Sequence, residues 1–256
     1  TGEEYLAEFR LRFADGSYCW HLARAVPLIE RGKIQMWVGT NTNISLQKEK
    51  EYKKDEFLSI ASHELKTPLT SIKAFTQLML RSKDAEKQKE LVKKSIENIT
   101  RLERLINDLL DVTKINAGKM NYNMEVFSFK QMLEESVANV QHTTSSHHIE
   151  LEPLVEMLYI GDAFRLEQVV NNFLTNAIKY SPECDKVLVR CKLLENSIIV
   201  SVQDFGIGIA TDSINRLFER YYRVDNSSMR FEGLGLGLFI SSEILKRHGG
   251  SFWIES

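Results

Sequence analysis

A histidine followed directly by a glutamate, His63-Glu64, is the part of the chain best suited to nucleophilic chemistry. On a helix that turns by about 100° per residue, His63 lies about 200° from both Ala61 and Leu65, so its side chain points away from their apolar stripe. The adjacent carboxylate of Glu64 can hold an exposed imidazole in one tautomer and make it more basic, as a nitrogen nucleophile requires. We therefore predict that His63 is a nucleophile and Glu64 its base. The alternative is an ordinary surface histidine of a helical bundle.

The residues that follow His63 narrow its role. Pro68 cannot donate a hydrogen bond to the Glu64 carbonyl and its ring crowds that carbonyl, so we expect the helix to bend there and make room for a phosphate donor. The string His-Glu-Leu-Lys-Thr-Pro-Leu-Thr, which begins at His63, resembles the phospho-acceptor motif of sensor histidine kinases, on the first helix of their dimerisation domain. The resemblance implies a phosphohistidine at His63. It also carries a secondary hypothesis, that Thr67 positions a water molecule that removes the phosphate again.

Two asparagines are candidate ligands of a metal ion. Asn172 and Asn176 are four residues apart, so they lie side by side on one helix face, and amide oxygens suit Mg²⁺, which bridges phosphates. We expect Asn176 to bind Mg²⁺, with Asn172 as a further candidate ligand; the alternative is two asparagines that face solvent. The run from Asn172 to Pro182 resembles the asparagine box of the same kinases, which implies that Lys179 and Tyr180 extend the site toward the nucleotide.

The sequence Asp-Phe-Gly-Ile-Gly-Ile, which begins at Asp204, places two glycines where a predicted strand ends. Glycine lets the backbone pass close to a ligand, because it has no Cβ. The motif resembles the first glycine box of the family. The resemblance implies that Asp204 accepts a hydrogen bond from the adenine amino group and that Gly206 and Gly208 border the nucleotide. The alternative is a plain Asp-x-Gly turn.

Aromatic side chains and two arginines come together in the run from Leu217 to Arg223, which resembles the aromatic box that precedes the ATP lid. Arg220 and Arg223 can each bind a phosphate through paired hydrogen bonds, and the resemblance ranks Arg223 first. Alternatively, the aromatic side chains belong to the core and the arginines form local salt bridges.

Three glycines at every second position open the last predicted helix. Free N–H groups at a helix N-terminus, together with the helix dipole, bind anions, so we expect phosphates to bind here. The motif resembles the second glycine box, and the polar stretch from Asp225 to Glu232 is then the lid over the nucleotide. The alternative is a flexible loop. The expected phosphate-binding positions are Gly233, Gly235, Leu236 and Gly237.

Two other classes of function were compared with the kinase. An ATP hydrolase is the first, because type II topoisomerases and heat-shock chaperones share the implied nucleotide fold. Hydrolytic members carry a glutamate base four residues before the metal-binding asparagine, where this chain has Asn172, and an amide cannot take the proton. The second is a catalytically weak dimeric sensor or scaffold that binds ATP without productive turnover. The intact Asp204, Asn176 and glycines favour nucleotide binding, although binding does not prove turnover.

Long helices must carry the acceptor motif. From about Ser45 to Asn116 the chain has one proline and no glycine, and it is rich in Glu and Lys. The break at Ser82 to Asp84 predicts an antiparallel hairpin. Its apolar stripes exceed what one hairpin can cover, so we expect a homodimeric four-helix bundle. The stripes step by three and four residues through Leu58, Ala61, Leu65, Pro68, Ile72, Phe75 and Met79, and through Leu91, Ser95, Asn98, Leu102, Leu105, Leu109 and Val112.

Strands and shorter helices alternate after a linker near Gly118, which predicts an α/β sandwich. Helices are expected over 128–142 and 163–180 and before His248, and strands near 125–127, 149, 158–160, 186–193, 197–204 and 250–255. The last of these strands runs into the end of the sequence.

Residues 1–44 contain three β-like runs separated by the turn signals Asp15-Gly16 and Arg31-Gly32-Lys33, which predict a three-stranded antiparallel meander. Three strands bury little surface alone, so we expect them to belong to a larger sheet. The strings Phe-Ala-Asp-Gly-Ser-Tyr-Cys-Trp and Gly-Thr-Asn-Thr-Asn-Ile resemble the C-terminal half of a PAS-type sensor domain. The other half of such a domain would hold most of a ligand pocket, so no signal is assigned.

Composition excludes several classes of function. In 256 residues the net charge is only −2, which argues against a nucleic-acid partner. Cys19, Cys184 and Cys191 lack paired spacing, as is usual for reduced thiols. No run approaches the roughly 18 apolar residues of a membrane helix, so we expect a cytoplasmic fragment without membrane contact. This expectation is compatible with a full-length protein that is attached to a membrane elsewhere. We interpret His147-His148 as solvated surface rather than a metal pair.

These features predict an α+β multidomain protein. Residues 1–44 form part of a PAS-like domain, residues 45–117 a dimerisation and histidine phosphotransfer hairpin, and residues 124–256 an ATP-binding α/β two-layer sandwich. The expected reaction is autophosphorylation of His63 from ATP and Mg²⁺, with Glu64 as base. Transfer to an aspartate in the receiver domain of a response regulator would follow.

Overall fold

A computed structural model describes residues 2–195, 197–220, 222 and 233–256. It divides into two compact units, Thr1–Ser62 and His63–Ser256, each of which is described by itself. Helix α1 (Ser45–Arg81) begins in the first unit and continues into the second.

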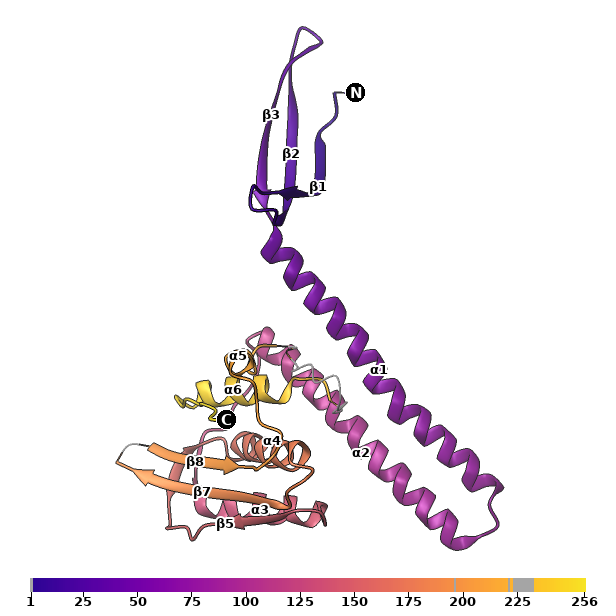
Figure 1. The fold of residues 1–256 in the computed structure, drawn as a ribbon, viewed down its shortest axis with the longest axis vertical. Helices are drawn as coiled ribbons and strands as arrows, with labels where there is room; N and C mark the ends of the chain where they lie inside the picture. The colour runs from indigo at the N-terminus through magenta and orange to yellow at the C-terminus, as the bar shows by residue number, and fades with distance from the viewer. Residues whose placement is uncertain (1, 196, 221, 223–232) are drawn as a thin grey trace. The chain divides into compact units, whose positions relative to one another are not determined.

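The first unit contains an antiparallel sheet in the order β1 (Tyr5–Arg12), β2 (Tyr18–Glu30) and β3 (Lys33–Asn43), which confirms the predicted meander. Figure 1 shows the three strands side by side, with α1 leaving the end of β3. The start of α1 is joined to the sheet, because Ser45 Oγ accepts a hydrogen bond from the backbone N–H of Trp20 at 2.9 Å. Large apolar side chains of the sheet stay exposed, among them Leu6, Val26, Leu28, Met36, Trp37 and Val38.

The predicted helical hairpin is confirmed by α1 and α2 (Ala85–Asn116). Asp84 caps α2, since its carboxylate accepts hydrogen bonds from the backbone N–H groups of Glu86 and Lys87. The Gln88 side chain closes the turn by donating to the carbonyls of Ser82 at 2.8 Å and Met79 at 3.3 Å. The helix α1 runs through Pro68 without interruption.

The predicted apolar stripe of α2 is the protected face of that helix. Leu91, Ser95, Leu105 and Val112 are buried, whereas a second set of apolar side chains on α2 remains exposed: Val92, Ile96, Ile99, Ile106 and Leu110. On α1 one predicted position was wrong, because Leu58 is 50% exposed and its neighbour Phe57 is buried. Phe57 is four residues from Ala61, so it continues the stripe that Leu58 leaves.

The second unit continues with the α/β sandwich that the sequence predicts. Strands β4 (Glu125–Ser128) and β6 (Leu158–Gly161) form one antiparallel pair. A second sheet has the order β5 (His148–Leu151), β7 (Lys186–Leu194) and β8 (Ser197–Gln203), with β5 parallel to β7. Asn196, in the predicted β7–β8 turn, lies outside the described residues.

Helices α3 (Phe129–Thr143) and α4 (Ala163–Tyr180) form the second layer, as Figure 1 shows, and α6 (Gly237–Arg247) packs on α4. A short helix, α5 (Thr211–Ile214), follows the second sheet. The core between the layers is formed by fully buried Leu133, Leu174, Ile240, Ile244, Val187 and Val189.

The predicted strand over residues 250–255 is wrong, since residues 250–256 form no strand. No described strand of the two sheets pairs with this segment, and other contacts hold it instead. The Phe252 ring lies on the Phe218 ring, with centroids 3.9 Å apart, and Ser256 Oγ accepts a hydrogen bond from the Ile209 N–H at 2.7 Å. Among the described residues no helix is both long and apolar enough to span a bilayer.

Candidate functional site

The acceptor motif lies on α1 with its histidine exposed. The His63 side chain faces solvent, as predicted, while Pro68 is fully buried. Thr67 Oγ1 donates a hydrogen bond to the His63 carbonyl at 3.0 Å. The hydroxyl oxygen of Thr67 keeps acceptor capacity, because only its proton is used in this bond.

Glu64, the predicted base, pairs with a residue that the sequence did not single out. Its Oε2 accepts a hydrogen bond from Arg101 Nη2 of α2 at 3.0 Å, and the Glu64 side chain is only 14% exposed. Charge-assisted pairs of this kind restrict the rotamer of the carboxylate. The hairpin register could have revealed Arg101, since Glu64 precedes Lys83 by 19 residues and Arg101 follows it by 18.

The asparagine pair is centred on α4, which begins at the N-cap Asp162 and buries Leu166, Val170 and Leu174. Asn172 Nδ2 donates a hydrogen bond to Ser241 Oγ of α6 at 2.9 Å, and Asn172 Oδ1 accepts one from Asn176 Nδ2 at 3.4 Å. This arrangement directs the nitrogen of Asn176 at Asn172, which leaves the oxygen of Asn176 as the atom that could hold a metal ion.

The loop after β8 rests on the end of α4. Asp204 Oδ1 accepts a hydrogen bond from the Gly206 N–H at 2.9 Å, and the Ile207 N–H donates to the Tyr180 carbonyl at 3.1 Å. A Cβ atom at Gly206 would lie 2.0 Å from the Tyr180 oxygen, so no other residue fits without a shift of the backbone. The Asp204 side chain stays exposed beside this contact, where a ligand can reach it.

The N-terminus of α6 has the features of an anion site. Its N-cap residue, Leu236, supplies no side-chain hydrogen bond, so the first N–H groups of the helix lack the usual cap. Gly235 has a φ of 66°, and a Cβ atom at Gly237 would lie 2.4 Å from Asn172 Oδ1. The Lys179 ammonium lies 3.6 Å from where a Cβ atom of Gly233 would stand, which brings a positive charge to the loop that leads into this helix.

Arg220 is exposed, and its guanidinium carbon lies 4.7 Å from the centre of the Phe239 ring of α6. This contact places the described part of the aromatic run next to the second glycine motif. Arg223 and the expected lid from Asp225 to Glu232 lie outside the described residues.

Helix α4 therefore brings the predicted nucleotide-binding residues together. Through Asn172 and Lys179 it meets the start of α6, and through Tyr180 it meets the loop of Gly206 and Gly208. The contacts of Glu64 and Thr67 described above stay within the helical hairpin. Gly206 and Gly237 let both glycine motifs pack against α4, because a Cβ atom at either position would collide with Tyr180 or Asn172. The exposed Asp204 carboxylate and the uncapped start of α6 are groups that fit a bound nucleotide.

A buried ionic cluster, which sequence reasoning missed, joins α2 to α4. Asp111 Oδ2 accepts hydrogen bonds from Arg165 Nη1 at 2.8 Å and from Gln168 Nε2 at 3.0 Å. One turn earlier, burial raises the pKa of the Asp108 carboxyl to about 6; the Asp111 carboxylate acts in the same direction and Arg104 opposes it. The cluster links the hairpin to the helix that carries Asn172 and Asn176.

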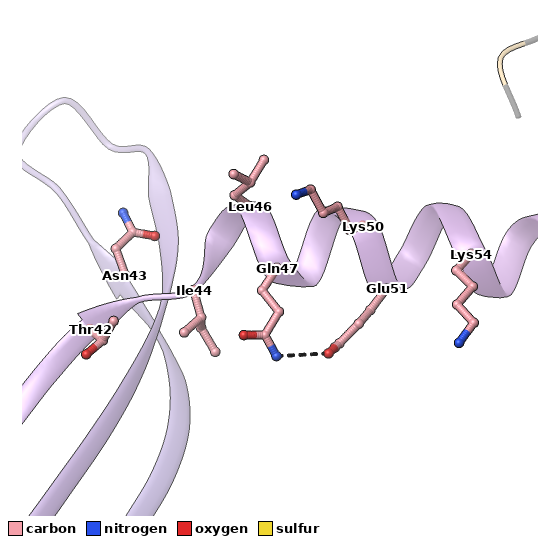
Figure 2. A pocket seen from close by; sticks show the side chains of 8 residues that line it. All are labelled: Thr42, Asn43, Ile44, Leu46, Gln47, Lys50, Glu51 and Lys54. Atoms are coloured by element: carbon pink, nitrogen blue, oxygen red, sulfur yellow. Dashed lines mark hydrogen bonds between the residues drawn. The ribbon is translucent and has the colours of Figure 1, made fainter. Parts of the chain in front are cut away.

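The first unit has a shallow depression of about 530 Å³ where β3 meets α1, bordered by Asn43, Ile44 and the first turns of the helix. Figure 2 shows that Leu46 and Lys50 point to one side of α1, and Gln47, Glu51 and Lys54 to the other. Gln47 donates a hydrogen bond to Glu51 at 3.1 Å. Since these side chains do not converge on one point, we assign no ligand to the depression.

Comparison with protein-family models gives two matches. Residues 53–118 match the His Kinase A (phospho-acceptor) domain, and residues 161–256 match the histidine kinase-, DNA gyrase B- and HSP90-like ATPase domain. The first match contains His63, and the second contains the α4 and α6 cluster.

Curated proteins and solved structures agree with these models. The sensor histidine kinase WalK of Bacillus subtilis is 31% identical over 89% of this chain, which spans 38% of that protein. The Acinetobacter baumannii histidine kinase AdeS has a TM-score of 0.53 at 25% identity, over 72% of this chain and 86% of AdeS. Histidine kinase ThkA, solved in complex with the response regulator protein TrrA, shares the fold with a TM-score of 0.52 at 20% identity, over 98% of this chain and 75% of ThkA.

Proposed function

Because the chain belongs to the sensor histidine kinase family, we propose that it binds ATP between α4, α6 and the Asp204 loop and transfers the γ-phosphate to His63. The observation that carries the proposal is the convergence on α4. Asn172, Lys179 and Tyr180 of this one helix contact both glycine motifs. The chain spans well under two thirds of its curated relatives, so the activity of a whole protein is part of the proposal.

The division of labour in the nucleotide site follows from the contacts. Asp204 accepts the hydrogen bond from the adenine amino group, and the N–H groups at Gly235, Leu236 and Gly237 bind phosphate oxygens, assisted by Lys179. Gly208, Arg220 and Arg223 are proposed to complete the nucleotide contacts. Asn176 would hold Mg²⁺ through its oxygen, and the ion when bound neutralises phosphate charge.

We propose that Asn172 has a structural role, in which its side chain bonds Ser241, and that it does not activate water. An amide cannot accept the proton of an attacking water, and Asn172 already donates to Ser241, which counts against the ATP-hydrolase alternative. The nucleophile is then His63, oriented by Glu64. Its imidazole nitrogen attacks the γ-phosphorus, the bond from the γ-phosphorus to the bridging oxygen breaks, and ADP leaves with the electron pair. The attacking nitrogen is the unprotonated one, and the proton on the other ring nitrogen passes to Glu64.

A homodimer is proposed because the hairpin leaves apolar side chains without cover. Leu69 of α1 is 58% exposed and Ile96 of α2 is 57% exposed, on helices whose other stripe is already protected. Exposed apolar stripes along two adjacent helices favour a four-helix bundle made with a second copy.

A response regulator is the proposed acceptor of the phosphoryl group from His63. ThkA, which shares the fold, was solved with a response regulator, and a phosphorus–nitrogen bond to imidazole is a good phosphoryl donor. Dephosphorylation assisted by Thr67 is proposed as a second activity, because its hydroxyl lies one turn from His63 and retains acceptor capacity.

The proposed domain limits are residues 1–44, 45–117 and 124–256. The exposed apolar residues on β2 and β3 support the view that the first of these belongs to a larger, PAS-like sheet. A cytoplasmic location is proposed for all three.

Incubation with ATP labelled at the γ-phosphate tests the proposal. We expect label that is acid-labile and alkali-stable, that is abolished in His63→Gln and that is retained in His142→Gln, a variant of another exposed histidine. Label that survives His63→Gln, or acid-stable label, would overturn the mechanism.

A further inference from the structure

We infer that His147 is a positioning residue for the adenine end of the nucleotide site. This inference rests on the proposed nucleotide site, but His147 is not one of the residues proposed to touch the nucleotide. His147 lies just before β5, far in sequence from the glycine motifs, and the expectation that it is solvated was wrong, because its side chain is buried. Its neighbour His148 is exposed, as expected.

Both ring nitrogens of His147 are used. Nε2 lies 2.9 Å from the carbonyl oxygen of Ser181, and Nδ1 lies 2.8 Å from Ser146 Oγ. A carbonyl oxygen only accepts, so Nε2 carries the proton and donates it to Ser181. In the neutral ring Nδ1 then accepts from the Ser146 hydroxyl, which selects the tautomer that this donation needs.

The carbonyl that His147 binds belongs to the end of α4. Helix α4 ends at Tyr180, and Ser181 is its fully buried C-cap residue. The last carbonyls of a helix have no donors within the helix and need other partners. The Ser181 carbonyl has two, a long hydrogen bond from the Cys184 N–H at 3.4 Å and the shorter one from His147.

The loop that we propose reads adenine, residues 204–208, packs against Tyr180, the residue before Ser181. The Tyr180 carbonyl accepts the hydrogen bond from the Ile207 N–H, and Gly206 passes so close that a Cβ atom would lie 2.0 Å from the Tyr180 oxygen. Asp204 is in turn tied to Gly206. A shift of the helix end by a few tenths of an ångström would therefore move the Asp204 carboxylate.

His147 is itself fixed from α3. Gln141 Nε2 donates to the His147 carbonyl at 2.9 Å, and Gln141 Oε1 accepts from the Ile149 N–H at 2.8 Å. The α3 helix thus anchors the backbone of His147, whose ring holds the end of α4. This path connects the helical layer to the loop that we propose reads adenine.

Substitution of His147 tests the role by separating nucleotide affinity from turnover. Glutamine can place its Nε2 donor where the histidine has Nε2, whereas leucine fills the space without a donor. For His147→Leu we expect the KM for ATP and the Kd values for ADP, AMP and adenosine all to rise by about 3- to 10-fold, as the loss of one hydrogen bond implies. The kcat at saturating ATP should stay within about twofold. His147→Gln should restore most of the affinity, and His148→Leu, the matched surface control, should leave it unchanged.

The outcomes separate the two proposals. A wild-type protein that binds no nucleotide would overturn the proposed function and this inference with it. Wild-type binding together with unchanged affinities in His147→Leu would overturn the inference alone, as would a loss confined to ATP, which points to the phosphate end. If His147→Leu does not fold, His147→Asn replaces it. Its amide nitrogen ends at the position of Nδ1 and cannot reach Ser181, so affinity below that of His147→Gln supports the role and equal affinity contradicts it.

Discussion

Glu64 has two neighbours that bear on its proposed role as a base, His63 and Arg101. It follows the proposed acceptor His63 in the sequence, and its carboxylate accepts a hydrogen bond from Arg101 across the hairpin. The guanidinium restricts the rotamer of the carboxylate.

Replacement of Glu64 by glutamine measures the contribution of the base. We expect Glu64→Gln to lower the initial rate of γ-phosphate incorporation by about 100-fold or more, as loss of a general base does, while ATP binding stays unchanged. Glu103→Gln, which alters an exposed glutamate of α2, is the control. Equal rates in Glu64→Gln and in the wild type would show that Glu64 does not act as the base.

Gly206 allows a purely steric test of the adenine loop. Alanine at this position would put a Cβ atom 2.0 Å from the Tyr180 oxygen, so we expect Gly206→Ala to weaken nucleotide binding by more than 10-fold, measured by calorimetric titration with ADP. Gly2→Ala is the control, because its Cβ atom would make only an ordinary contact, with Ile29 Cδ1 at 3.5 Å. Unchanged ADP affinity in Gly206→Ala would contradict the placement of the nucleotide beside this loop.

Two aspartates of α2 near its contact with α4 differ in their surroundings. Asp111 accepts hydrogen bonds from Arg165 and Gln168, whereas Asp108 is half-buried near Asp111 and has a raised pKa. Burial favours the protonated form of Asp108, so its charged form opposes the packing of the helix at neutral pH.

The pH dependence of stability should expose Asp108. Its pKa is about 6 in the folded chain, against about 3.9 when unfolded, so the folded state binds an extra proton between these values. The contribution of Asp108 to the free energy of unfolding is therefore fully present below about pH 4, and it is lost as the pH rises through 6. We expect Asp108→Asn to stabilise the protein at pH 8 by up to about 3 kcal/mol, with the gain vanishing near pH 4. Urea denaturation at both pH values measures this, and a gain that is equal at both would contradict the assignment.

For the whole molecule, the apolar stripe on α2 matters most, because a single chain leaves it exposed to solvent. Ile96 and Ile99 are exposed on a helix whose Leu91, Ser95 and Leu105 are buried. A charge placed on the stripe would have to be buried in a four-helix bundle, and an unpaired buried charge is costly.

We expect Ile96→Glu to convert a dimer to a monomer in sedimentation equilibrium, with a rise in the dimer Kd of at least about 100-fold. Lys93→Glu, which changes an exposed charge on the same helix, should leave the dimer intact. A dimer that is as stable with Ile96→Glu as without it would place the interface elsewhere.

Part of the geometry of the proposed site could be predicted, because its residues are close in the sequence or are required by backbone geometry. Asn172 and Asn176 share a helix face at a spacing of four, and Gly206 and Gly237 lie where a Cβ atom would collide. The partners of these residues could not be predicted in the same way. Ser241, which holds Asn172, and Arg101, which holds Glu64, are 69 and 37 residues away from them.

The helices, the strand meander and the residue types of the proposed site are encoded locally, because propensity, periodicity and the need for glycine act over a few residues. Packing between distant segments, by contrast, buries His147, pairs Asp111 with Arg165 and leaves residues 250–256 without a strand. Each of these depends on which distant backbone or charge lies within about 3 Å, and hydrogen bonds at that range are set by packing and not by the order of residues.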